Sequence, residues 1–154
     1  MIETISIEQL NECNLEDYLR LAHEFLKSSF HLGIENYDDF VRETYSIAKN
    51  LLSEPNTTLL TAKKDDSFIG YLTANFTLTL HLNGYDCYVR ELYIKPEYRR
   101  QGIGSLLMQT IELLAVQKKC KRISLATRWD NDIQSSFYAS LGFNRRCDFI
   151  SKII

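Results

Sequence analysis

The sequence predicts an α/β fold of the α+β type, with a mixed, mostly antiparallel central sheet of six to seven strands flanked by about four helices. Three observations predict it. Short extended patterns bounded by turn residues fill the middle of the chain, and apolar residues recur at helical spacing on either side of them. A chain of 154 residues, 45% of them hydrophobic, can also bury one core without a metal or disulfides. No repeat or Gly/Ser/Pro-rich linker interrupts it, which favours a single domain over residues 1–154.

The first third of the chain predicts strand, helix, helix. Residues 2–7 alternate enough for a strand, and Asn14 is a residue type that caps helices. The first helix fades near Gly33, and a second begins near Asn36 and ends before Pro55. The apolar face of the first helix consists of Leu15, Leu19, Ala22 and Leu26.

The middle of the chain predicts three consecutive antiparallel strands. Residues 58–62 form the first, and the polar residues 64–67 turn the chain into the second at residues 68–76. Asn83-Gly84 is a strong hairpin signal and leads into the third strand, residues 85–94.

The last third predicts two helices and two strands. The strongest helix in the chain begins at Ile103, because apolar residues recur there at helical spacing. A short strand follows at residues 122–127, then a helix at residues 133–141 that Gly142 closes. Residues 145–153 predict a final strand. The helical stripe consists of Ile103, Leu107, Ile111 and Leu114.

Composition excludes several classes of protein. The net charge of −2 gives no reason to expect a nucleic-acid partner. The N-terminus lacks a basic start followed by an apolar stretch, and no apolar run is long enough to span a bilayer, so we expect a cytoplasmic protein without a membrane partner. The four cysteines are far apart and form no metal-binding pattern, so we expect reduced thiols and no metal. They are Cys13, Cys87, Cys120 and Cys147.

The informative stretch is residues 92–104, LYIKPEYRRQGIG, where a strand runs through a basic turn into a helix. The first N–H groups of a helix have no partner within it and lie at the positive end of its dipole. Gly102 and Gly104 carry no side chain that would keep a phosphate from the backbone, while Arg99 and Arg100 add positive charge. This combination predicts a site for a pyrophosphate.

These residues resemble the GCN5-related N-acetyltransferases (GNAT), whose motif is Arg or Gln, two variable residues, Gly, one variable residue, then Gly or Ala. Residues 99–104, RRQGIG, fit that motif fully. The resemblance extends to the preceding strand and to residues 129–143, and together these segments cover about the last two-fifths of the chain.

The resemblance implies acetyl-CoA as acyl donor, bound where two parallel strands splay apart and the pantetheine arm acts as an extra strand. Backbone groups of Leu92, Tyr93 and Ile94 would pair with pantetheine amides. The turn and helix entrance would hold the pyrophosphate, and Asn131 and Tyr138 would contact the cofactor from the other side. The turn residues implied are Arg99, Arg100, Gln101, Gly102, Ile103, Gly104 and Ser105.

Two catalytic roles follow from the chemistry and the resemblance. An alkylamine, with a pKa of about 10.4, must lose a proton before it attacks a thioester, and Glu91 is the candidate base, directly or through water. The leaving thiolate, with a pKa of about 8.5, needs stabilisation, and Tyr138 is the candidate for it. The alternatives are a structural carboxylate at Glu91 and a core aromatic at Tyr138. Regular alternation places Glu91 on one face with Val89 and Tyr93, and Arg90 on the other.

The acceptor expected is a primary amine of a small molecule: a polyamine, an amino acid or an aminoglycoside-like compound. Two alternatives remain, a non-catalytic acyl-CoA sensor and an enzyme that acetylates a protein or peptide amine. A homodimer is compatible with the resemblance.

Trp129 is expected to pack near the cofactor side or to line the acceptor site. An acidic cluster either attracts a cationic amine or follows from the preference of helix starts for acidic residues; its members are Glu35, Asp38, Asp39 and Glu43.

Overall fold

The computed structural model describes residues 4–30, 35–128, 130–147 and 149–154. The chain divides into two compact units, Met1–Ser124 and Leu125–Ile154. The predictions made for Gly33 and Trp129, and for the start of the first strand, lie outside the described residues.

The first unit is built on a sheet whose strands follow the order β1-β2-β3-β4-β5. Neighbouring strands from β1 to β4 pair antiparallel, which confirms the predicted run of antiparallel strands. β5 follows β4 through helix α3, the kind of crossover that joins parallel neighbours, so the sheet is mixed. The bounds are β1 Ile5–Gln9, β2 Thr57–Lys64, β3 Ser67–Thr79, β4 Gly84–Ile94, β5 Cys120–Leu125 and α3 Ile103–Gln117.

The prediction of six to seven strands is wrong, because the described part of the chain contains five. The predicted last strand, residues 145–153, has no regular structure at its described positions, and Phe149, Ile150 and Ile153 are 70%, 91% and 95% exposed. An apolar, β-branched segment becomes a strand only when a neighbouring strand pairs with its backbone. No such pairing is present for the described residues of this segment.

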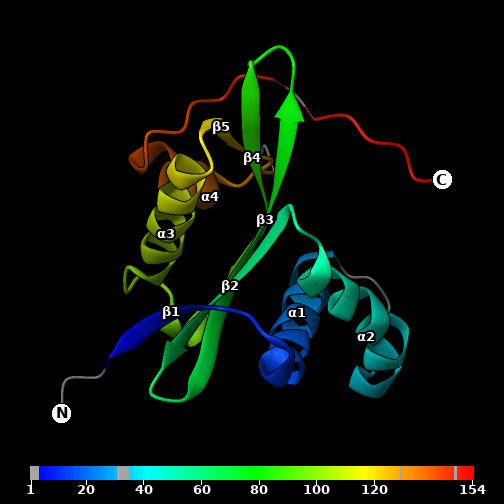
Figure 1. Cartoon of the computed structure of the whole chain (residues 1–154). Helices are drawn as coiled ribbons and strands as arrows, with labels where there is room; N and C mark the ends of the chain where they lie inside the picture. Colours follow the sequence, from blue (N-terminus) through cyan, green and yellow to red (C-terminus); the bar gives the residue numbers. More distant parts are fainter. Residues whose placement is uncertain (1–3, 31–34, 129, 148) are drawn as a thin grey trace. The chain divides into compact units, whose positions relative to one another are not determined.

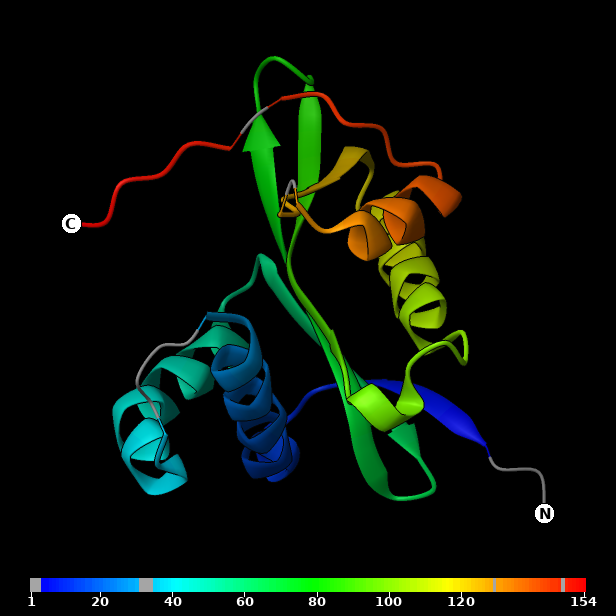
Figure 2. The same cartoon turned by 180° about the vertical axis from the view of Figure 1, so that it is seen from behind.

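Helices cover both faces of the sheet. Figure 1 and the reverse view in Figure 2 show α1 (Leu15–Phe30) and α2 (Tyr37–Ser53) on one side of the sheet and α3 on the other. Tyr71 and Leu72 follow each other in β3, so they point to opposite faces, and both are almost fully buried. The sheet therefore lies between two apolar layers. None of the helices in the described chain has the length and apolar character needed to cross a membrane.

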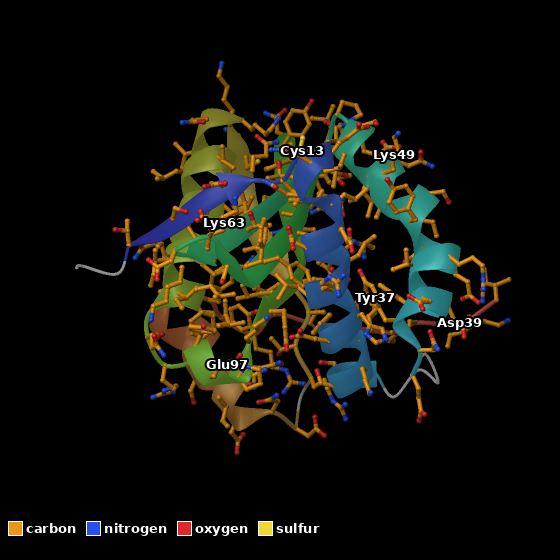
Figure 3. All side chains as sticks on the ribbon, turned by 90° about the horizontal axis from the view of Figure 1, so that it is seen from below. Cys13, Tyr37, Asp39, Lys49, Lys63 and Glu97 are labelled. Atoms are coloured by element: carbon orange, nitrogen blue, oxygen red, sulfur yellow. The ribbon has the colours of Figure 1, made fainter. Side chains whose placement is uncertain are left out.

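Local signals in the sequence set the helix ends. The Asn36 side chain accepts hydrogen bonds from the N–H groups of Asp38 and Asp39, as predicted for the start of α2. Asn14 is instead the last residue of a 3₁₀ turn, η1 (Glu12–Asn14), that precedes α1, and Asn11 caps this turn by accepting from the Cys13 N–H. Tyr37, labelled in Figure 3, joins the two helices: its hydroxyl donates to the Glu16 carbonyl at 3.4 Å.

Candidate active site

The turn between β4 and α3 is held in shape by its own side chains. It contains a 3₁₀ turn, η2 (Pro96–Tyr98), whose Glu97 is labelled in Figure 3. The Arg99 Nε donates to the Ile94 carbonyl at 2.9 Å, and the Gln101 Nε2 donates to the Glu97 carbonyl at 3.1 Å. These bonds fix the path of the backbone between the strand and the helix.

The entrance to α3 presents backbone N–H groups. Arg100 and Gly102 have φ values of 63° and 81°, and Gly102 is the N-cap residue, without a side chain to accept a hydrogen bond. The first helical bond runs from the Leu106 N–H to the Gly102 carbonyl at 3.0 Å. The N–H groups of the first turn therefore have no acceptor within the helix and lie at its positive end.

The space above this entrance fits a phosphate. A Cβ added at Gly102 would meet no heavy atom within 4 Å, so glycine is required there by its left-handed backbone and not by packing. Arg99, Arg100, Gln101 and Gly102 are all exposed. An anion can therefore approach the main chain, and the residues present fit the diphosphate of a coenzyme.

A β-bulge in β4 lies next to this turn. Thr73 pairs with Glu91, but Ala74 pairs with Val89, so Arg90 is an extra residue without a partner on β3. Paired residues point to the same face, and Thr73 and Ala74 point to opposite faces. Glu91 and Val89 therefore lie on opposite faces, and the prediction that they share one is wrong.

The bulge also brings Arg90 to the face that carries Glu91. The Arg90 Nε donates to the Asn75 Oδ1 at 3.1 Å, and Asn75 alternates with Thr73 on the face covered by α1. The prediction that Arg90 points the other way, with Leu92 and Ile94, is therefore wrong as well. A guanidinium and a carboxylate meet on one face because the bulge changes the phase of the strand.

Glu91 is partly buried. Burial raises the pKa of its carboxyl, against the opposing effects of the nearby Tyr71 and Thr73 hydroxyls and of the Arg90 charge. The Thr73 Oγ1 lies 3.5 Å from the Glu91 Oε2. A carboxylate with a raised pKa is a stronger proton acceptor than an exposed one, which suits a general base.

The predicted cofactor-pairing strand end carries one buried aromatic residue. Tyr93 is 6% exposed, and its hydroxyl donates to the Glu24 Oε2 on α1 at 3.4 Å. Burial raises the pKa of Tyr93 to about 12. Its side chain thus belongs to the core under α1, so any contact with a cofactor would come from its backbone.

β5 is attached to the opposite end of β4. Asp86 on β4 is 9% exposed and accepts two hydrogen bonds from Arg122, at 3.1 and 3.0 Å, and one from the Ser124 hydroxyl at 2.9 Å. Asp86 lies six residues before Leu92, about 20 Å along an extended strand. The attachment therefore joins β5 to β4 near the N-terminal end of β4, at the opposite end from the glycine turn.

The second unit contains the other two predicted site residues. Asn131 is the N-cap of α4 (Asp132–Ser140), where its Oδ1 accepts from the Gln134 N–H at 3.0 Å. Tyr138 packs between Phe137 and Phe143, with ring centroids 5.0 and 5.8 Å away. Burial raises its pKa to about 12, so its hydroxyl keeps its proton at neutral pH. Gly142, at φ 87°, ends the helix as predicted.

The structure groups the predicted residues in two sets. The strand end, the turn and the entrance of α3 form one continuous set in the first unit, and Glu91 lies on the bulged strand that leads into it. Asn131 and Tyr138 form the second set, on α4. Sequence reasoning missed Tyr71 and Thr73, which alternate on β3 and lie beside Glu91.

The other candidates have local explanations. Asp38 and Asp39 lie in the first turn of α2 and, like Glu35 and Glu43, are exposed. The described residues contain no cluster of His, Cys, Asp and Glu that would hold a metal ion. The four cysteines are free, as predicted, with Cys87 buried and Cys13 exposed.

A glycine turn that leads from a strand into an open helix entrance is a ready-made site for a phosphate or a diphosphate. Residues 15–143 match the model of the acetyltransferase (GNAT) family, so the chain belongs to this family and is an acetyl-CoA-dependent acyltransferase.

Comparisons with individual proteins agree with this assignment. The chain is 24% identical over 143 residues to an aminoglycoside N(6′)-acetyltransferase type 1 of Acinetobacter haemolyticus, covering 90% of each chain. It is 29% identical over 149 residues to a spermidine N(1)-acetyltransferase of Thermoplasma acidophilum, covering 91% of this chain and 88% of the other. The solved structure of AAC(6′)-Iy with the bisubstrate analogue CoA-S-monomethyl-acetylneamine has the same fold, with a TM-score of 0.79 at 19% identity, covering 98% of this chain and 99% of that one.

Proposed function

We propose that this enzyme transfers the acetyl group of acetyl-CoA to a primary amine of a small molecule, by direct attack of the amine on the thioester. Two relatives that match over about nine-tenths of this chain are named for aminoglycoside and spermidine acetylation, and both kinds of acceptor are small molecules with amino groups. The observation that carries the proposal is the open helix entrance after the glycine turn, within a chain of this family.

For the donor, we propose that the backbone N–H groups from Arg100 to Gly104 hold the diphosphate of acetyl-CoA. The attachment of β5 at Asp86 supports a splayed β4–β5 pair, with the backbone of residues 92–94 available to the pantetheine arm. The proposed contacts of the donor also include Arg99, Ser105, Asn131 and Tyr138.

For the acceptor, we propose that Glu91 takes the proton of the ammonium group. A free alkylamine has a pKa of about 10.4, so a base must remove a proton before the nitrogen lone pair can attack the carbonyl carbon. The raised pKa of Glu91 favours this transfer, and its position on the bulged strand places it beside the proposed donor-pairing residues.

For the leaving group, we propose that the Tyr138 hydroxyl donates a hydrogen bond to the departing thiolate. When the tetrahedral intermediate collapses, the C–S bond breaks and its electron pair stays on sulfur. Because the pKa of Tyr138 is about 12 and that of a thiol is about 8.5, complete proton transfer from Tyr138 is unfavourable. The tyrosine thus stabilises the thiolate, and solvent supplies the proton that yields coenzyme A.

A thiol-release assay tests the function. Purified enzyme, acetyl-CoA and a thiol-reactive dye are combined with single amines from a panel of polyamines, aminoglycosides, amino acids and peptides. We expect dye signal above the background only with particular small amines, and the acetylated product should be identified by mass spectrometry. Binding of acetyl-CoA without amine-dependent release would instead favour the acyl-CoA sensor, and release with peptides alone would favour a protein acceptor.

A further inference from the structure

Tyr71 has a buried hydroxyl that the described core does not explain. The residue is 1% exposed, and its hydroxyl forms no hydrogen bond of acceptable geometry with any described residue. Leaving a buried hydroxyl without a partner costs about 1–3 kcal/mol, and phenylalanine would fill the same space without that cost. The Tyr71 hydroxyl therefore needs a hydrogen-bond partner that the described residues do not supply in this structure.

The group beside that hydroxyl is the Glu91 carboxylate. Tyr71 pairs with Tyr93 and Thr73 pairs with Glu91 across the β3–β4 ladder, so all four side chains point to the face covered by α1. Tyr71 and Glu91 lie close enough for Tyr71 to lower the pKa of the carboxyl, although the two groups fall short of a formed hydrogen bond. The Thr73 hydroxyl does donate a long hydrogen bond to the carboxylate, with its Oγ1 at 3.5 Å from the Glu91 Oε2.

Aromatic rings fix the position of Tyr71. The Tyr18 ring on α1 meets it edge-on with centroids 5.2 Å apart, and the Phe25 and Tyr93 rings lie at 6.2 and 6.1 Å. A ring packed on three sides cannot swing away, so its hydroxyl stays beside Glu91. The bulge at Arg90, in contrast, gives the β4 backbone at Glu91 a local irregularity in pairing.

We propose that Tyr71 is a positioning residue of the active site: together with Thr73 it offers two hydroxyl donors to the Glu91 carboxylate. Catalytic hydrogen bonds are often long in a free enzyme and tighten in the complex with substrate. The two donors orient one carboxylate oxygen and leave the other for the ammonium proton. This inference rests on the proposed role of Glu91 as proton acceptor.

Among the described residues, the charged and titratable side chains that face Glu91 come from α1, β3 and β4. Tyr18 faces it from α1, Tyr71 from β3, and Arg90 from β4, while Tyr93 is engaged with Glu24. Hydrogen bonds to the ionised carboxylate lower its pKa, so removing one must raise it. A tyrosine with a merely structural role would have no such effect.

The experiment is an NMR titration of the Glu91 carboxyl in full-length protein labelled with ¹³C at glutamate side chains, with Glu91→Gln to assign the signal. We expect Tyr71→Phe to raise the pKa of Glu91 and to move the acid limb of the kcat/KM profile to higher pH by the same amount. Thr73→Val should act in the same direction. The matched control is Tyr18→Phe, which removes a neighbouring hydroxyl that forms no hydrogen bond with Glu91 and should leave its pKa unchanged.

Tyr71→Phe removes one oxygen from a buried ring, so the variant should fold, and an unchanged acetyl-CoA affinity should show that it does. If the titration of Glu91 is the same in Tyr71→Phe, Thr73→Val and the wild type, the inference is overturned. Failure of the proposed function is a separate outcome: Glu91→Gln would then turn over at the wild-type rate, whatever the titration in Tyr71→Phe shows.

Discussion

Glu91 is a partly buried carboxylate, and this placement has a consequence for stability as well as for catalysis. Burial raises its pKa in the folded protein above the ordinary value of the unfolded chain. A proton is therefore bound more tightly in the folded state, and stability is lost as the pH rises from the ordinary carboxyl pKa through the raised one. Above that range the fold carries the cost of a buried charge.

We predict that Glu91→Gln raises the melting temperature at pH 8 and leaves it unchanged at pH 4. The neutral amide removes the buried charge at high pH, whereas at low pH the wild-type side chain is already neutral. Thermal melts followed by circular dichroism at the two pH values measure this. The control is Glu97→Gln, which changes an exposed carboxylate and should shift both melts equally. A Glu91→Gln variant that melts below the wild type at pH 8 would contradict the assignment.

Tyr138 is the second residue whose environment defines its chemistry. We predict that Tyr138→Phe lowers kcat about 100-fold and leaves the acetyl-CoA affinity unchanged, because only the stabilisation of the leaving thiolate is lost. Steady-state kinetics and calorimetry measure the two quantities. With a pKa of about 12, Tyr138 should cause no loss of activity below about pH 11. Tyr45→Phe, at an exposed position on α2, is the matched control and should keep the wild-type kcat.

If Tyr138→Phe and the wild type have the same kcat, Tyr138 does not stabilise the leaving thiolate. Its role would then be to pack between Phe137 and Phe143.

The element that shapes the candidate site is the β3–β4 hairpin. The turn at residues 80–83 joins the two strands, and from Thr79 opposite Gly84 to Ala74 opposite Val89 the pairing is regular. One extra residue, Arg90, then shifts every later pair. The same shift turns Glu91 toward α1 and brings Thr73 opposite it, so the chemistry of this face depends on one bulge.

The bulge also shows the limit of prediction from sequence. Local signals such as Asn36, Pro55 and Gly142 are sufficient for helix ends, because a cap or a break acts within a few residues. A bulge and its partners depend on pairing between strands, which alternation alone does not encode. The predicted strand at residues 145–153 is wrong for a related reason, since its apolar residues would need a neighbouring strand.

The attachment of β5 to β4 is the element-scale feature that can be tested by stability. We predict that Asp86→Asn destabilises the protein by about 2 kcal/mol, because Arg122 and Ser124 lose a charged, largely buried acceptor. Urea denaturation measures the free energy of unfolding. The matched control is Asp130→Asn, which removes the exposed partner of Arg128 and should cost less than about 1 kcal/mol. Similar losses of unfolding free energy in the two variants would show that the hydrogen bonds of Asp86 stabilise the sheet no more than an exposed ion pair does.

At the scale of the whole molecule, the family explains why the last two-fifths of the chain carried the functional prediction. We propose that the glycine turn from Arg99 to Gly104 binds a donor common to the family, which would explain why its sequence is recognisable in isolation. Acceptors differ between the relatives, which are named for aminoglycosides and for spermidine. No single motif therefore identifies the acceptor of this enzyme.

The central claim is that the main-chain amides of the turn from Arg100 to Gly104 hold the diphosphate of acetyl-CoA. Gly102 and Gly142 offer a matched pair for testing it, because both have a left-handed backbone and a Cβ added at either position would meet no heavy atom within 4 Å. Alanine should therefore introduce a similar backbone strain at the two positions, of about 1–2 kcal/mol. Only the methyl group at Gly102 would enter the space proposed for a phosphate.

The most direct measurement is isothermal titration calorimetry of acetyl-CoA with the wild type, Gly102→Ala and Gly142→Ala, after circular dichroism has shown that all three are folded. We predict saturable binding of acetyl-CoA to the wild type and to Gly142→Ala. Gly102→Ala should bind acetyl-CoA at least about tenfold more weakly than the wild type, which corresponds to about 1.4 kcal/mol. The absence of binding to the wild type, or equal affinity in all three proteins, would contradict this prediction.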